Sequence, residues 1–241
     1  MAKRRLTGYG WAPYWFPMVS FLALVEIGNR VPESWALGFL ALKVAVPGGF
    51  VAWYAWRGSY PELRGGLRPS PASALDVGIG LLGAILWVAP FLLFDGLRPD
   101  SEGFDPERFG GAATEAMVLR ALGYAAVTPF VEELFVRSWM LRFIDVFDQR
   151  KDFRSVPIAR FRWRSFVIVS LYFVFTHQSW EWGVMAVWTL LTMAWFYHRR
   201  QMAALVLVHA VTNGAIFVFV MLYDGRFSDA SGVPIGLRFL L

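Results

Sequence analysis

The chain has 241 residues, of which 57% are hydrophobic and 17% aromatic, and its formal net charge is +5. This composition differs from that of a water-soluble domain of the same length and is typical of an integral membrane protein. Because the sequence contains no cysteine, it excludes disulfide bonds, thiolate metal sites and a cysteine nucleophile.

Apolar segments long enough to cross a bilayer recur along the whole chain. A transmembrane helix needs about 20 mostly apolar residues, so we expect an all-α fold, a polytopic bundle of about seven to eight transmembrane helices. We expect a single integral membrane domain over residues 1–241. The basic start and first apolar segment resemble a signal peptide but lack a small-residue cleavage site, so we assign them to the first span. The seven predicted spans are 11–27, 35–56, 74–94, 122–142, 165–180, 182–197 and 201–223.

Basic residues concentrate in alternate connections, whereas the connection 95–111 is acidic. Cytoplasmic loops carry an excess of Lys and Arg, so this alternation predicts a cytoplasmic N-terminus. The membrane that we expect is a bacterial plasma membrane, with the endoplasmic reticulum as the alternative. Membrane topology accounts for these charges better than nucleic-acid binding, and we expect no nucleic-acid partner. The basic residues are Lys3, Arg4 and Arg5 before the first span; Arg57, Arg64 and Arg68 after the second; Arg150, Lys151, Arg154, Arg160, Arg162 and Arg164 before the fifth; and Arg199 and Arg200 before the seventh.

Several ionisable residues fall inside the predicted spans, where a charge is costly and indicates a functional site by default. At about 1.5 Å per helical residue, Glu132, His177 and His209 each lie roughly 12 to 18 Å from the cytoplasmic end of their span. Three spans therefore bring polar groups to one level, which favours a single site. Other charges near span ends, Glu26, Lys43 and Asp76, are expected at the interface. The candidate site residues are Glu132, Glu133, Arg137, His177, His209 and Asn213.

Helical spacing separates the roles of these residues. Glu133 and Arg137 are four apart with the acid first, the favourable order for an ion pair. Glu132 points about 100° away from Glu133 and is left without a local partner, as a general base requires. His209 and Asn213 are also four apart, so they share a helix face from which both can donate hydrogen bonds to an oxyanion.

The residue pattern leaves other chemistries open. Zinc accepts the ligand types of Glu132, His177 and His209, although the HExxH signature is missing. Neither a GxGD motif nor a GxSxG nucleophile elbow is present. A proton relay or transporter would also use intramembrane Glu and His, but the inverted repeats typical of transporters are absent from the sequence. A polar core retained by a non-catalytic scaffold is the remaining alternative.

Three motifs occur in order on separate predicted spans: "EELFVR" (132–137), "FVFTH" (173–177) and "HAVTN" (209–213). Read as EExxxR, FxxxH and HxxxN, they resemble the CPBP family of glutamic intramembrane proteases, which includes the CAAX-processing endoprotease. The motif-bearing core spans about 112–223. The acidic "GFDP" connection is also similar to that of bacterial members linked to C-terminal protein sorting.

The resemblance implies a metal-free and cofactor-free hydrolysis of a peptide bond without an acyl-enzyme. It implies that Glu132 and His177 activate water, that His209 and Asn213 form the oxyanion hole, and that Glu133 and Arg137 complete the first motif. The partners implied are membrane lipid and a membrane-anchored protein substrate, cleaved near its C-terminus. The same family includes proteins of bacteriocin self-immunity, so an immunity or scaffold protein stays an alternative.

Overall fold

The computed structural model describes residues 10–28, 30–64, 70–101, 103–149 and 151–241. These residues are helical or in loops, and they contain no strand apart from an isolated bridge between Ser228 and Pro234. The all-helical prediction is confirmed. The helices are α1 (Ala12–Gly28), α2 (Ala36–Trp56), α3 (Pro71–Leu93), α4 (Ala113–Leu122), α5 (Thr128–Glu133), α6 (Leu141–Ile144), α7 (Trp163–Phe175), α8 (Trp182–Arg199) and α9 (Met202–Tyr223).

Three helical segments are long and apolar enough to cross a membrane: Glu33–Trp56, Pro71–Leu93 and Met202–Tyr223. The apolar helices Ala12–Gly28 and Trp163–Phe175 are shorter. Large apolar side chains such as Ile85 and Leu190 are exposed on the outside of the bundle, where a soluble protein would carry charge. The chain is a helical integral membrane protein.

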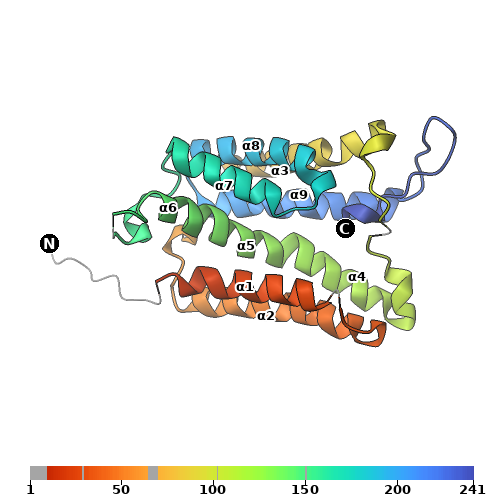
Figure 1. Ribbon diagram of the computed structural model, residues 1–241, viewed down its shortest axis with the longest axis horizontal. Helices are drawn as coiled ribbons and strands as arrows, with labels where there is room; N and C mark the ends of the chain where they lie inside the picture. The colour runs from red at the N-terminus through yellow and green to blue at the C-terminus, as the bar shows by residue number, and fades with distance from the viewer. Residues whose placement is uncertain (1–9, 29, 65–69, 102, 150) are drawn as a thin grey trace.

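The bundle has three parts, with their long axes roughly aligned (Figure 1). Helices α1 and α2 pack as a pair on one side, and α3, α7, α8 and α9 form a group on the other. The stretch from α4 to α6 runs between them. Residues 113–144 are helical throughout, because the π-helical turns Gly123–Val127 and Leu134–Met140 join α4, α5 and α6. Every candidate site helix therefore contacts this central stretch or belongs to it.

The central helix begins nine residues before the predicted start at residue 122. Its first part contains Glu115 and Arg120, whose charges hid the helix from a search for apolar runs. Pro129 lies between the two π turns and lacks the N–H that an α-helix would use one turn back. π turns inside α-helices are frequently found at functional sites.

The fifth predicted span, 165–180, is also corrected. Helix α7 ends at Phe175, and the chain then turns into a short 3₁₀ helix, Ser179–Glu181. His177 therefore lies in the turn between α7 and α8 rather than within a transmembrane helix. The residues 176–181, THQSWE, are polar apart from Trp180, so the sequence did carry a signal of this helix end.

Helices α3 and α9 approach each other closely through glycine. A Cβ atom at Gly80 would lie 2.8 Å from the carbonyl oxygen of Val208, and one at Gly83 would lie 2.7 Å from the Thr212 hydroxyl. Small residues allow helix backbones to come together in membranes. This packing fixes the face of α9 that carries His209 and Asn213.

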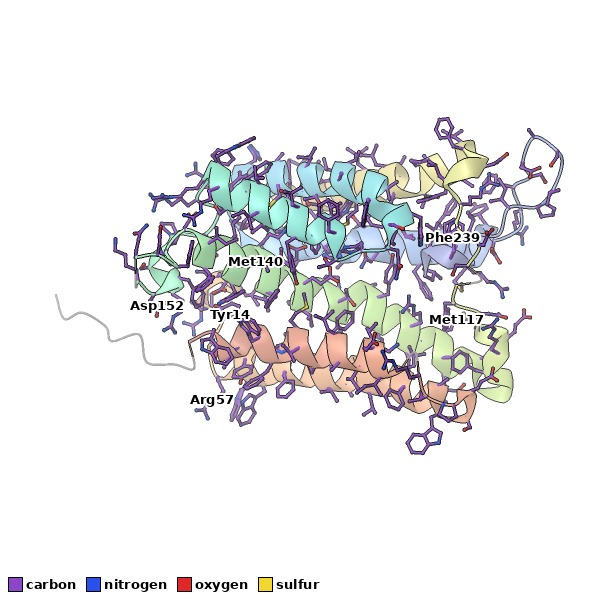
Figure 2. The ribbon with its side chains drawn as sticks, viewed as in Figure 1. Tyr14, Arg57, Met117, Met140, Asp152 and Phe239 are labelled. Carbon is purple, nitrogen blue, oxygen red and sulfur yellow. The ribbon has the colours of Figure 1, made fainter. Side chains whose placement is uncertain are left out.

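The connections alternate between the two ends of the bundle (Figure 1). The segments 57–64, 145–149, 151–162 and 200–201 share one end, and the segments 95–101, 103–112 and 224–237 share the other. Figure 2 shows Arg57 and Asp152 at the first end and Met117 and Phe239 at the second. The described basic connections are thus at one end, and the acidic connection is at the other. Lys3, Arg4, Arg5, Arg68 and Arg150 lie outside the described residues.

Candidate active site

A buried ion pair forms the base of the site. Arg137 Nη1 donates to Glu133 Oε1 at 3.2 Å, and both side chains are fully buried. His209 Nδ1 lies 2.8 Å from the same oxygen, so Glu133 joins the central helix to α9. The pair between Glu133 and Arg137 is the one expected from their spacing. The contact with His209 is between helices, and no spacing rule could have predicted it.

Aromatic rings enclose the arginine of this pair. The Arg137 guanidinium carbon lies 3.8 Å from the centroid of the Phe173 ring and 5.7 Å from that of Trp188. The Trp188 ring also contacts His209, with centroids 4.7 Å apart. A cation over an aromatic face is stabilised most when it is desolvated. The rings therefore replace part of the solvation that burial removes from Arg137.

Glu132 occupies a different position from its neighbour. It is half-buried, and among the residues that the structure describes its carboxylate has no side-chain hydrogen bond. It lines a small cavity of about 80 Å³ together with His177, His209 and Asn213. The structure thus brings these four predicted residues to one cavity and places the pair of Glu133 and Arg137 behind it.

The hydrogen bonds of the two histidines assign their protons. His177 Nδ1 lies 2.7 Å from the carbonyl oxygen of Phe173, which can only accept, so Nδ1 carries the proton. His209 Nδ1 likewise donates to the Glu133 carboxylate. In both rings Nε2 is the nitrogen without a partner among the described residues. Nε2 is therefore the nitrogen left for water or substrate.

Asn213 is oriented by the first π turn. Its Nδ2 donates to the carbonyl oxygen of Tyr124 at 2.8 Å, and Tyr124 lies within the turn Gly123–Val127. The irregular turn thus supplies an acceptor for the amide. Since an amide nitrogen has two hydrogens, one remains without a partner among the described residues, and Asn213 lines the small cavity.

Glu181 is a site residue that the sequence motifs did not indicate. It lines the small cavity beside Glu132 and His177, and it accepts a hydrogen bond from the Gln178 backbone N–H at 2.9 Å. Burial raises the pKa of Glu181, and the charge of Glu132 raises it further, against the opposing effects of Gln178 and His177. The sequence would have indicated Glu181 as a site residue only if the end of α7 had been predicted correctly.

A second and larger cavity, of about 750 Å³, opens beside the small one. Glu132, Glu181 and Tyr124 line both. The large cavity extends to Asp100 and Ser101, which are exposed on the acidic connection. A chain segment that enters from that end of the bundle has a route to Glu132.

The site was also considered as a metal centre. Among the described residues, no three His, Cys, Asp or Glu side chains lie close enough together to hold a metal ion. The three ligands considered for zinc, Glu132, His177 and His209, share a cavity without forming such a cluster. Among the described residues, the carboxylate that His209 bonds is that of Glu133, not that of Glu132.

A family model described as type II CAAX prenyl endopeptidase, Rce1-like, matches residues 114–215. This segment belongs to that family. The matched segment begins in α4, ends in α9 and contains all three motifs. Helices α1 to α3 lie outside the match. No curated protein and no solved structure matches the chain.

Proposed function

We propose that the protein is a glutamic intramembrane endopeptidase in which Glu132 activates the attacking water. The observation that carries this proposal is the cavity shared by Glu132, His177, His209 and Asn213. A carboxylate without a local partner, two histidines and an amide are the groups that water activation and oxyanion stabilisation require. The family match over the same residues supports it independently.

The reaction proceeds by direct attack of water. Glu132, assisted by Nε2 of His177, takes a proton from the water. The oxygen of the water bonds to the scissile carbonyl carbon at the same time. The carbonyl oxygen becomes an oxyanion, and the bond between carbon and nitrogen then breaks. The proton held by Glu132 or His177 passes to the leaving amine. The products are a carboxylic acid and an amine, and no acyl-enzyme forms.

His209 and Asn213 are proposed to hold the oxyanion. Because His209 Nδ1 already donates to Glu133, donation from Nε2 requires the imidazolium form. The Glu133 carboxylate stabilises that positive charge, and Arg137 fixes the position of the carboxylate. Glu133 and Arg137 therefore act as positioning residues for His209. Asn213 contributes the N–H that Tyr124 does not engage.

The proposed substrate is a membrane-tethered protein segment, cut near its C-terminus. A soluble peptide has little reason to reach a cavity between transmembrane helices, whereas a tethered segment is delivered there by its anchor. The large cavity reaches the acidic end of the bundle, and the basic connections share the opposite end. With the basic end in the cytoplasm of a bacterium, the substrate enters from the outer face of the plasma membrane.

This orientation is testable because the chain has no cysteine of its own. Single cysteines are introduced at two exposed residues, Ala230 in the segment 224–237 and Gln149 in the segment 145–149. These segments lie at opposite ends of the bundle. A membrane-impermeant maleimide added to intact cells should label Ala230→Cys and not Gln149→Cys. The reverse labelling would contradict the proposed orientation and the outer entry route.

The activity itself is tested with the purified protein in detergent. A library of lipid-tethered C-terminal peptides is incubated with it, with and without a strong chelator, and the products are identified by mass spectrometry. We expect a defined cleavage site near the C-terminus and equal rates in both conditions. Loss of cleavage with chelator would favour the zinc peptidase, whereas no cleavage of any peptide would favour the scaffold or proton-relay alternatives.

A further inference from the structure

Glu181 is a carboxyl group of the site to which the proposed reaction gives no role. It lines the small cavity of about 80 Å³ together with Glu132 and His177. A cavity of this volume has room for a water molecule. Two glutamates therefore border the space in which we place the attacking water, although one of them is sufficient to activate it.

Part of the reason for a side chain of this length at residue 181 is local. Glu181 Oε2 accepts a hydrogen bond from the Gln178 backbone N–H at 2.9 Å, and the Gln178 side chain accepts one from the Glu181 backbone in return. This reciprocal arrangement is a capping box, in which glutamine serves as well as glutamate. The other carboxyl oxygen, Oε1, has no partner among the residues that the structure describes. The cap therefore accounts for the position of the side chain but not for its acidic group.

The surroundings of Glu181 favour a carboxyl group that keeps its proton. Burial raises the pKa of Glu181, and the negative charge of Glu132 raises it further, whereas the Gln178 N–H and His177 act in the opposite direction. The net effect is an increase. A protonated carboxyl group beside a carboxylate is the arrangement in which one group acts as an acid and the other as a base.

The other ionisable groups at the small cavity already have partners or roles. His177 is assigned to assist Glu132, and His209 donates through Nδ1 to Glu133. The Tyr124 hydroxyl donates to the backbone oxygen of Leu240 at 3.4 Å. Three further charged residues line only the large cavity: Lys43, Asp100 and Arg120. Glu181 is thus the group at the small cavity that has both a proton to give and no other use for it.

We propose that Glu181 is the general acid that protonates the leaving amine. The inference rests on the proposed function and adds a second catalytic carboxyl group to it. Glu132 takes a proton from the water as the water oxygen bonds to the scissile carbon. The bond between carbon and nitrogen then breaks while Glu181 gives its proton to the nitrogen. Glu181 regains a proton from Glu132 or His177, so the products are a carboxylic acid and an amine and the enzyme is restored.

The need for this acid depends on the leaving group. An alkyl amine is too basic to leave as an anion, so its nitrogen has to receive a proton as the bond breaks. A nitrophenolate is a stable anion and leaves without one. Removal of the proton on Glu181 should therefore slow the hydrolysis of an amide and spare that of a nitrophenyl ester.

Two tethered substrates test this difference. They share the residues before the scissile bond, where one has the peptide bond that the wild type cleaves and the other has a nitrophenyl ester. Glu181→Gln retains the acceptor for the Gln178 N–H and removes the proton. It should cleave the amide about 10²- to 10⁴-fold more slowly than the wild type, the usual contribution of a general acid, and the ester at a rate within about threefold. Both rates are measured on one preparation, so an unfolded fraction does not change their ratio.

Three further variants serve as controls. Glu181→Asp retains a carboxyl group and should recover part of the amide rate. Glu33→Gln removes an exposed glutamate from another 3₁₀ helix, Glu33–Trp35, which lines neither cavity of the site, and it should leave both rates unchanged. Glu132→Gln should lose both activities, because both substrates require an activated water.

The outcomes separate this inference from the proposed function. Amide and ester rates that fall by the same factor in Glu181→Gln would overturn the inference, because a purely structural role lowers both. Amide cleavage at the wild-type rate would overturn it as well. Neither result bears on Glu132, whereas cleavage of both substrates by Glu132→Gln at the wild-type rates would refute the proposed function itself.

Discussion

The ion pair behind the proposed active site makes a quantitative prediction. Glu133 and Arg137 are both fully buried, and their contact has the length of an ordinary hydrogen bond, 3.2 Å. Removing one member of a buried pair costs about 3–5 kcal/mol, because the other charge is left without its partner. Arg137→Met should therefore remove a large part of a stability that is typically about 5–15 kcal/mol.

The assay is thermal unfolding in detergent, followed by the fluorescence of tryptophan. For a chain of this size, each kcal/mol lowers the midpoint by about 2–4 °C, so the expected decrease is about 6–20 °C. The double variant Glu133→Gln with Arg137→Met removes both charges and retains an acceptor for His209. It should recover at least half of the lost stability but should stay inactive, because His209 has lost its carboxylate.

Two results would refute this reasoning. A midpoint for Arg137→Met within about 2 °C of the wild type would mean that the buried charge of Glu133 costs little when it is unpaired. A double variant less stable than the single variant would mean that the Glu133 carboxylate still stabilises the fold without Arg137, through its bond to His209, and is not a destabilising unpaired charge.

Three further predictions concern the surroundings of the site. Asn213→Ala should lower kcat by about 10²- to 10³-fold, as for the loss of one oxyanion donor, and should cost about 1–3 kcal/mol of stability because the Tyr124 carbonyl loses its donor; an unchanged kcat would exclude the amide from the oxyanion role. Gly80→Ala should destabilise the protein by about 1–3 kcal/mol, because the new Cβ meets the α9 backbone, whereas Gly78→Ala, which meets no atom within 4 Å, should not. Burial raises the pKa of Glu181, so its contribution to stability is present at low pH and is lost as the pH rises through the raised value. The stability of Glu181→Gln, measured by thermal midpoints from about pH 4 to pH 8, should therefore increase relative to the wild type as the pH rises.

Local spacing accounts for the features of the site that could be predicted. The four-residue separations of Glu133 from Arg137 and of His209 from Asn213 place each pair on one helix face, and a single helix determines such geometry. The separation of Glu132 from its neighbour also follows from helical rotation alone. These relations within one helix do not depend on how the helices pack against one another.

The remaining features depend on contacts between helices or on irregular backbone. The bond from His209 to Glu133 joins residues 76 positions apart, and no local pattern encodes it. The π turn that presents the Tyr124 carbonyl to Asn213 leaves no hydropathy signal. Helix α7 ends earlier than the predicted span, so His177 and Glu181 lie in the turn that follows it. A search for apolar spans does not detect such a turn.

The role of Glu132 is tested most directly by one rate comparison. Wild type, Glu132→Gln and Glu115→Gln are purified in detergent, shown to unfold at similar temperatures, and assayed with chelator on the peptide that the wild type cleaves. Glu115 is exposed on the same long helix and provides a matched control. We predict that Glu115→Gln cleaves at the wild-type rate and that Glu132→Gln is slower by more than the 10²- to 10³-fold typical of losing an oxyanion donor. Cleavage by Glu132→Gln at the rate of the control would contradict the assignment of Glu132 as the base.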